Sequence, residues 1–243
     1  MIAQDTIQFG KTEINYDILY SDRRRNATLS VYPMKQIEIT VPQDLEREHI
    51  QNLVRKKASW IIKQVLWFDE ILQVDSQKEH VNGETYLYSG RQYRLKITNK
   101  QARPEAKLIG KYLEVALPEN TPQNKQKKII KVAIYDWYRK QAHKKVLDAV
   151  KDYSKKLGIE PPKFIIKNQY KRWGSCTKNN ILNFNFRIAM APASQINYVV
   201  AHELCHVLHK DHSVKFWKSL STIMPDYEDR KEALRKEGWQ YVL

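Results

Sequence analysis

The pattern H-E-x-x-H at residues 202–206 constrains the fold of this chain more than any other feature. If the segment is an α-helix, the imidazoles of His202 and His206 lie one turn apart on the same face and can bind one metal ion. Glu203 lies at the edge of that face, where a carboxylate can act as a general base without being a ligand. The pattern therefore predicts a catalytic metal centre on a helix.

The surrounding residues indicate that this helix is buried. Apolar side chains cover most of the rest of the segment, namely Ile196, Val199, Val200, Ala201, Leu204, Val207 and Leu208. A helix that is apolar nearly all round is a buried helix, and burial of two imidazoles and a carboxylate is costly unless they are paired. A bound cation supplies that pairing, so a metal site is favoured over two unrelated histidines.

A catalytic zinc site needs a third protein ligand, and two histidines follow the helix. His209 continues the helical face, but seven residues place it about 10 Å along the axis from His202. His212 reaches the same ion if the helix ends near His209 or Lys210 and the chain turns back. Its spacing from His206 equals that of the second and third ligands in H-E-x-x-H-x-x-G-x-x-H enzymes. The spacing favours His212, and His209 is then a helix cap or a support for a ligand.

Further motifs in the C-terminal half resemble one protein family. They are R-W-G-S-C at 172–176 and the motifs at 185–187, 198–206, 212–213, 216–217 and 225–227. Together they resemble the YgjP-like family of zinc metallopeptidases, which is related to the WLM and SprT-like zincin domains. The N-terminal half fits that family in layout only, and Phe186 stands where the family usually has Trp. The resemblance implies His202, His206 and His212 as ligands of Zn²⁺ and Glu203 as the catalytic base.

Five more residues are candidates for binding substrate or for supporting the ligands. Arg172 and Arg187 are candidates for holding an anionic group or a polarised carbonyl oxygen, with ordinary ion pairs as the alternative. Asn185 shares one face of a predicted strand with Arg187, and that face is expected to line the cleft. Asp226 is a candidate acceptor for a ligand imidazole, and Tyr227 is a candidate donor to a developing oxyanion.

Periodicity predicts an α+β fold. Residues 6–42 alternate as half-buried strands do, a helix follows from 44 to about 71, and the polar stretch 73–82 indicates a linker. Strands are expected at 86–88, 93–97 and 112–117, with a loop at 101–107. A helix from Pro122 to Gly158 and strands at 164–166 and 182–188 precede the H-E-x-x-H helix. We expect a β-rich N-terminal subdomain with one long helix over residues 1–121 and a zincin-like metallohydrolase domain over residues 122–243. The sequence has no visible internal repeat.

The chain is strongly basic, with 42 Lys and Arg against 27 Asp and Glu and a formal net charge of +15. A domain of this charge attracts polyanions, so nonspecific binding of nucleic acid or nucleotides through a basic surface is one expectation. A charge that serves only solubility is the alternative. Runs at 23–25 and 125–128 concentrate the positive charge.

Cysteine usage and hydropathy predict a cytoplasmic protein. Cys205 lies within the ligand helix, so a disulfide with Cys176 is not expected, and free thiols fit a reducing cytosol. No stretch approaches the ~18 apolar residues of a transmembrane helix. The N-terminal residues lack the basic and apolar regions of a secretory signal, and we expect no membrane association.

The leading functional prediction is a zinc-dependent hydrolase that acts on polypeptides. Zn²⁺ lowers the pKa of its water to about 7 and polarises a carbonyl, and Glu203 carries the proton to the leaving group. One alternative is hydrolysis of a phosphoanhydride such as a nucleoside triphosphate, which the positive charge suggests, although three His ligands differ from the oxygen-rich sites of magnesium-dependent phosphate chemistry. A second alternative is a nucleic-acid-binding module with a structural zinc, a type of site that normally has four ligands rich in Cys.

Overall fold

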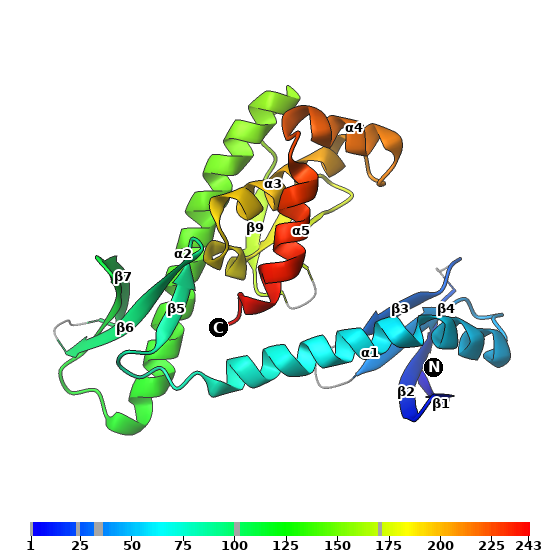
Figure 1. Ribbon diagram of the computed structural model, residues 1–243, viewed down its shortest axis with the longest axis horizontal. Coiled ribbons are helices and arrows are strands. Elements are labelled where there is room, and N and C mark those ends of the chain that lie inside the picture. Colours follow the sequence, from blue (N-terminus) through cyan, green and yellow to red (C-terminus); the bar gives the residue numbers. More distant parts are fainter. Residues whose placement is uncertain (1, 23–24, 32–35, 100–102, 170–171) are drawn as a thin grey trace. The chain divides into compact units, whose positions relative to one another are not determined.

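The computed structural model describes residues 2–22, 25–31, 36–99, 103–169 and 172–243. The fold is α+β, with several small sheets and five α-helices in the described ranges (Figure 1). Contacts along the chain divide it into two compact units, Met1–Ser76 and Gln77–Leu243. This division comes earlier in the chain than the expected domain boundary after residue 121. None of the described helices is long and apolar enough to cross a membrane.

The first unit is a four-stranded sheet followed by a long helix. β1 (Ile2–Phe9) and β2 (Thr12–Tyr20) form an antiparallel hairpin, β4 (Ile37–Val41) runs parallel to β2, and β3 (Thr28–Val31) pairs with β4 in the antiparallel direction. α1 (Arg47–Gln77) contributes Ile50, Val54, Ala58 and Ile61 to the core formed with the sheet. These residues recur every three or four positions, which is the spacing of one helical face.

One sequence expectation near the end of the first unit differs from the structure, and another lies partly outside the described residues. The stretch 73–82 was expected to be a linker, but α1 continues through Gln77, so much of that stretch is helical. Of the basic run at 23–25, Arg23 and Arg24 lie outside the described residues.

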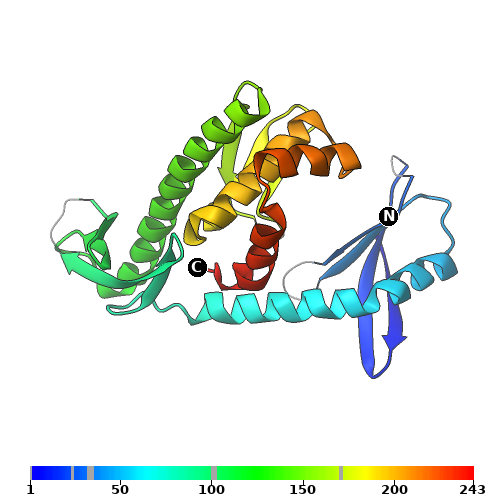
Figure 2. The same ribbon diagram turned by 45° about the horizontal axis from the view of Figure 1, so that its top comes forward.

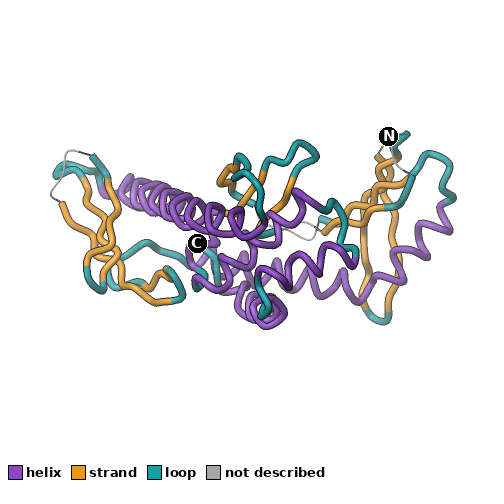
Figure 3. Tube along the Cα trace, turned by 90° about the horizontal axis from the view of Figure 1, so that it is seen from above, coloured by secondary structure: helices purple, strands orange, loops and turns teal. Residues whose placement is uncertain are grey.

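The second unit opens with a sheet of the same topology. β5 (Thr85–Tyr88) and β6 (Arg91–Asn99) form a hairpin, β8 (Tyr112–Leu117) runs parallel to β6, and β7 (Glu105–Ile109) pairs antiparallel with β8. The strand order β1-β2-β4-β3 is thus repeated as β5-β6-β8-β7, and each sheet precedes a long helix, the second being α2 (Gln123–Leu157). In Figure 3 the strands of both sheets are orange and both helices are purple. β7 replaces part of the loop expected at 101–107; its alternation is short, with Ala106 and Leu108 less exposed than Glu105, Lys107 and Ile109.

The sheet of β5–β8 belongs to the second unit because it shares a core with α2. Leu95 and Val115 are buried in one cluster with Ile134 of α2. The turn between β5 and β6 is also tied to a later segment, since the N–H groups of Ser89 and Gly90 donate to the carbonyls of Ala189 and Met190 at 2.9 and 2.8 Å. β5–β8 and α2 therefore lie in one compact unit.

The remainder of the second unit carries the H-E-x-x-H helix. A three-stranded sheet, in the order β10-β11-β9, comprises β9 (Phe164–Lys167), β10 (Gly174–Cys176) and β11 (Leu182–Asn185). The 3₁₀ helix η2 (Phe186–Met190), α3 (Ala193–Leu208), α4 (Val214–Ile223), α5 (Tyr227–Glu237) and η3 (Gly238–Gln240) follow. α3 packs along α2, as both ribbon views show (Figures 1 and 2). The strand expected at 182–188 ends at Asn185 because the Asn185 side chain accepts the Arg187 N–H at 3.1 Å and caps the 3₁₀ helix.

Candidate metal centre

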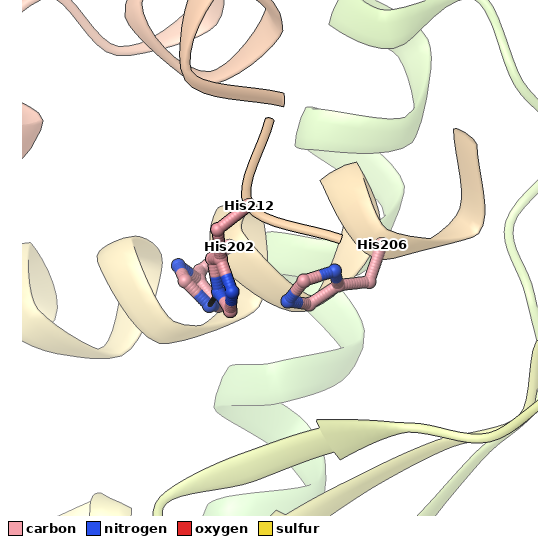
Figure 4. A group of neighbouring side chains, drawn as sticks. All are labelled: His202, His206 and His212. Carbon is pink, nitrogen blue, oxygen red and sulfur yellow. Dashed lines mark hydrogen bonds between the residues drawn. The ribbon is translucent and has the colours of Figure 1, made fainter. Parts of the chain in front are cut away.

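The end of α3 brings a third histidine back to the first two. The helix ends at Leu208, and His209 has extended backbone angles, with φ −129° and ψ 110°. The chain then reverses, so that His212 Nε2 lies 3.1 Å from His202 Nε2. Nitrogen atoms of His202, His206 and His212 all lie within 4.8 Å of one another, and the three imidazoles gather at one point in Figure 4.

This arrangement fits a divalent metal ion. Two nitrogens bound tetrahedrally to zinc at 2.0–2.1 Å are about 3.3 Å apart, close to the 3.1 Å between the Nε2 atoms of His202 and His212. Burial and the neighbouring imidazoles of His206 and His212 lower the pKa of His202 to about 3. His202 is therefore neutral at pH 7, which is the protonation state of a metal ligand.

The backbone of His209 orients one of these imidazoles. The Nδ1 of His206 lies 2.9 Å from the His209 carbonyl oxygen, and a carbonyl can only accept, so Nδ1 carries the proton and Nε2 keeps its lone pair. The His209 ring turns away and its Nε2 lies 3.0 Å from Ser219 Oγ. His209 thus supports a neighbouring imidazole, which was the role expected for it if His212 joined the cluster.

Aromatic side chains of α4 hold the three imidazoles. The Phe216 ring lies 4.9, 4.5 and 4.8 Å from the rings of His202, His206 and His212. Trp217 stacks on His212 at 5.6 Å. Because Phe216 is fully buried, this packing restricts the imidazoles before any ion binds.

Glu203 lies beside the cluster in a tight, largely apolar environment. Its side chain is only 7% exposed and sits against Gly174 of β10, where an added Cβ would be 2.6 Å from Glu203 Cγ. Burial raises the pKa of Glu203 to about 7, although Arg172 and the backbone N–H of Cys176 act in the opposite direction. A carboxylate with a pKa near neutrality can both accept and release a proton. Sequence reasoning did not single out Gly174 as the residue that makes room for this side chain.

Two predicted polar residues lie away from this cluster. Asn185 donates through Nδ2 to the Gln169 carbonyl at 2.7 Å. Arg187 is 5% exposed, donates to Asn168 Oδ1 at 2.6 Å and lies over the Phe186 ring. Neither residue lines the cleft beside His202 and Glu203. Their described contacts instead connect the end of β11 to the segment at 168–169. The apolar periodicity of residues 182–188 did not reveal the 3₁₀ turn that redirects them.

The other three predicted residues differ in their surroundings. Arg172 is exposed and lines the cleft beside Glu203. The Asp226 carboxylate accepts from Arg230 Nε at 2.8 Å. Tyr227 donates to Glu228 Oε1 at 2.9 Å, and its ring stacks on Trp217 at 5.5 Å. These contacts place Tyr227 behind the ring that stacks on His212.

Among the described residues, the cluster contains three possible metal ligands and no fourth. The group of possible ligands comprises three histidines, and Cys176 Sγ instead lies 3.6 Å from Lys210 Nζ. Burial raises the pKa of the Cys176 thiol, which disfavours the thiolate that binds metals. Three protein ligands would leave a position for water, an arrangement typical of catalytic rather than structural zinc sites.

Comparison with known proteins agrees with the family suggested by the motifs. Residues 25–237 match the model of the YgjP-like metallopeptidase domain. Similar solved structures include metallopeptidase zymogens, Pyrococcus abyssi abylysin (19% identity, 37% of this chain and 93% of that chain, TM-score 0.35) and Methanocaldococcus jannaschii jannalysin (20% identity, 38% and 88%, TM-score 0.35). No curated protein matched the chain. Because the family match spans most of the sequence, the chain belongs to the YgjP-like family and carries its metallopeptidase domain.

Proposed function

We propose that this protein is a zinc-dependent peptidase of the zincin type, with His202, His206 and His212 as the metal ligands and Glu203 as the general base. The convergence of the three imidazoles beside a buried carboxylate carries the proposal. When bound, Zn²⁺ supplies Lewis acidity that activates a water and polarises the scissile carbonyl. The family assignment supports a polypeptide substrate.

Glu203 does the proton transfer in this proposal. Its pKa of about 7 allows the carboxylate to take a proton from the attacking water and to deliver that proton to the leaving amine nitrogen. Because Gly174 has no side chain, β10 leaves room for the Glu203 side chain between the strand and α3. The Nδ1–H of His206 donates to the His209 carbonyl oxygen, which leaves the Nε2 lone pair of His206 for the metal ion.

The edge of β10 is the proposed place for an extended substrate. β10 is an outer strand of its three-stranded sheet and adjoins α3 beside Glu203. An outer strand offers unpaired backbone groups, with which an extended peptide can form an additional strand. Such pairing would hold the scissile bond near the three histidines without reading the sequence of the peptide.

The test is cleavage of an unfolded protein by zinc-loaded protein and by its Glu203→Gln variant. We expect the variant to retain its zinc and its circular dichroism spectrum while losing at least about 100-fold in turnover, the contribution of general acid–base catalysis. Turnover within a few-fold of wild type in the zinc-loaded variant would exclude Glu203 as the base.

Two further activities are tested with the same preparations. The cationic side chains that line the cleft, Arg172, Lys231 and Arg235, favour anionic ligands, so phosphate release from nucleoside triphosphates tests the phosphoanhydride alternative. Nonspecific nucleic-acid binding is a separate proposal that rests on exposed lysines at the start of α2, Lys125 and Lys128 among them. Its signature is an affinity for DNA fragments that falls linearly with the logarithm of salt concentration.

A further inference from the structure

A cleft of 330 Å³ lies beside the three histidines, within the second unit. α3 contributes Tyr198, His202 and Glu203 to its walls, and α5 contributes Lys231 and Leu234. Because His202 and Glu203 line the cleft, a group bound there is adjacent to the bond that the proposed reaction would break. The cleft therefore has the position of a side-chain subsite.

One wall of the cleft is apolar and held in place. Trp173 forms this wall together with Leu234. The Trp173 ring packs edge-on against Tyr241 at 5.8 Å, and a Cβ added at Gly238 would be 3.1 Å from Trp173 Cζ2. The C-terminal segment thus fixes the indole, so the wall is formed before a ligand enters.

The rim of the cleft is positively charged. Arg172, Lys231 and Arg235 line it, and Glu203 is the sole acidic residue among the described lining. Arg235 is already paired with Glu232 at 2.6 Å. Within the described ranges, Arg172 and Lys231 form no ion pair with a carboxylate. The Lys231 Nζ lies 4.9 Å from the centre of the Trp217 ring, the ring that stacks on His212.

We propose that this cleft is a specificity subsite for a glutamate side chain of a polypeptide substrate, next to the scissile bond; this inference rests on the proposed peptidase function. The carboxylate would bind between Arg172 and Lys231, and the methylene groups would pack on the Trp173 wall. Glutamate suits this combination better than aspartate because it has the longer apolar stem. A lysine in the same position would bring a fourth positive charge to the rim.

The binding test uses zinc-loaded Glu203→Gln protein and two uncleavable peptides that differ only by Glu or Gln at one position. We expect the Glu peptide to bind about tenfold more tightly by calorimetry, as for one charge-assisted hydrogen bond near a surface. Adding Lys231→Glu should abolish that preference. Lys151→Glu, which makes the same charge change at an exposed position of α2, should leave it intact. Equal binding of the two peptides, or equal effects of Lys231→Glu and Lys151→Glu, would overturn the subsite.

A cleavage test separates this inference from the proposed function. Wild-type protein acting on a peptide mixture should cut beside Glu, and Lys231→Glu should shift the preference toward Lys. Cleavage with no preference for Glu would reject the subsite while the peptidase function stands. A Glu preference in binding, without cleavage of any peptide, would reject the peptidase function while the subsite stands.

Discussion

Replacing Gly174 by alanine tests whether the position of Glu203 is set by its contact with β10. An added Cβ would lie 2.6, 2.7 and 2.9 Å from Glu203 Cγ, Oε1 and Cδ. Carbon atoms pack at about 3.5–4.0 Å, so the Glu203 side chain has to move by about 1 Å. Gly174 is not among the described residues with positive φ, which means that the backbone itself tolerates alanine. The effect of the substitution is therefore confined to the collision with Glu203.

The expected cost of Gly174→Ala is larger for activity than for stability. Overpacking of this kind destabilises a fold by about 1–3 kcal/mol, whereas a 1 Å misplacement at a reacting centre costs about 100-fold in rate. Zinc binding should persist because the three histidines are not touched. Turnover of an unfolded protein, zinc content and urea unfolding together measure these effects.

The control for Gly174→Ala is Ser175→Ala on the same strand. The Ser175 hydroxyl contacts Asn183 at 3.3 Å, and its loss should leave turnover within about threefold of wild type, because it leaves Glu203 in place. A zinc-loaded Gly174→Ala protein with turnover as high as that of Ser175→Ala would refute the reasoning. It would mean that Glu203 is displaced without consequence or does not serve as the base.

Three further predictions concern the ligands, the buried acid and the first unit. His212→Ala should lose at least about tenfold in zinc affinity, while His209→Ala should lose less, because the His209 carbonyl rather than its ring contacts His206; full zinc retention in His212→Ala would contradict this. In metal-free protein, Glu203→Gln should stabilise the fold by about 3 kcal/mol at pH 8 and by almost nothing at pH 4. The reason is that the Glu203 carboxyl keeps its proton up to pH about 7 in the folded protein, whereas it ionises near pH 4.5 in the unfolded chain. If the stability gained by Glu203→Gln did not grow between pH 4.5 and 7, the raised pKa would be excluded. Asp5→Asn should destabilise the first unit at pH 7, since it breaks the 2.7 Å ion pair between buried Asp5 and the largely exposed Arg47. That ion pair holds the pKa of Asp5 well below its usual 3.8. In urea unfolding, the wild-type protein should therefore be more stable than Asp5→Asn above pH 4, and the difference should shrink at lower pH.

Local patterns were sufficient to predict the helix that carries the candidate ligands. The apolar residues around His202 and His206 indicate a buried helix, and α3 spans Ala193–Leu208 as that pattern requires. The strands of the first unit follow from alternation in the same way, because a side chain's face in a strand or helix depends only on its position in the repeat. The boundaries of α2 follow from Pro122 and from Gly158, which adopts φ 66° after the last turn.

Contacts between distant segments decided the rest. Where the helix would end was open in the sequence, and the return of His212 to His202 depends on the turn at His209 and on packing against Phe216. The contact between Gly174 and Glu203 joins residues 29 positions apart, and local periodicity cannot predict a contact over that separation. The repeated strand order of the two sheets was invisible for a related reason: topology depends on which strands pair, whereas different apolar sequences satisfy the same pairing. The division into compact units falls after Ser76, and strands β5–β8 share a buried core with α2. Which elements pack together in this way is decided only in the tertiary structure.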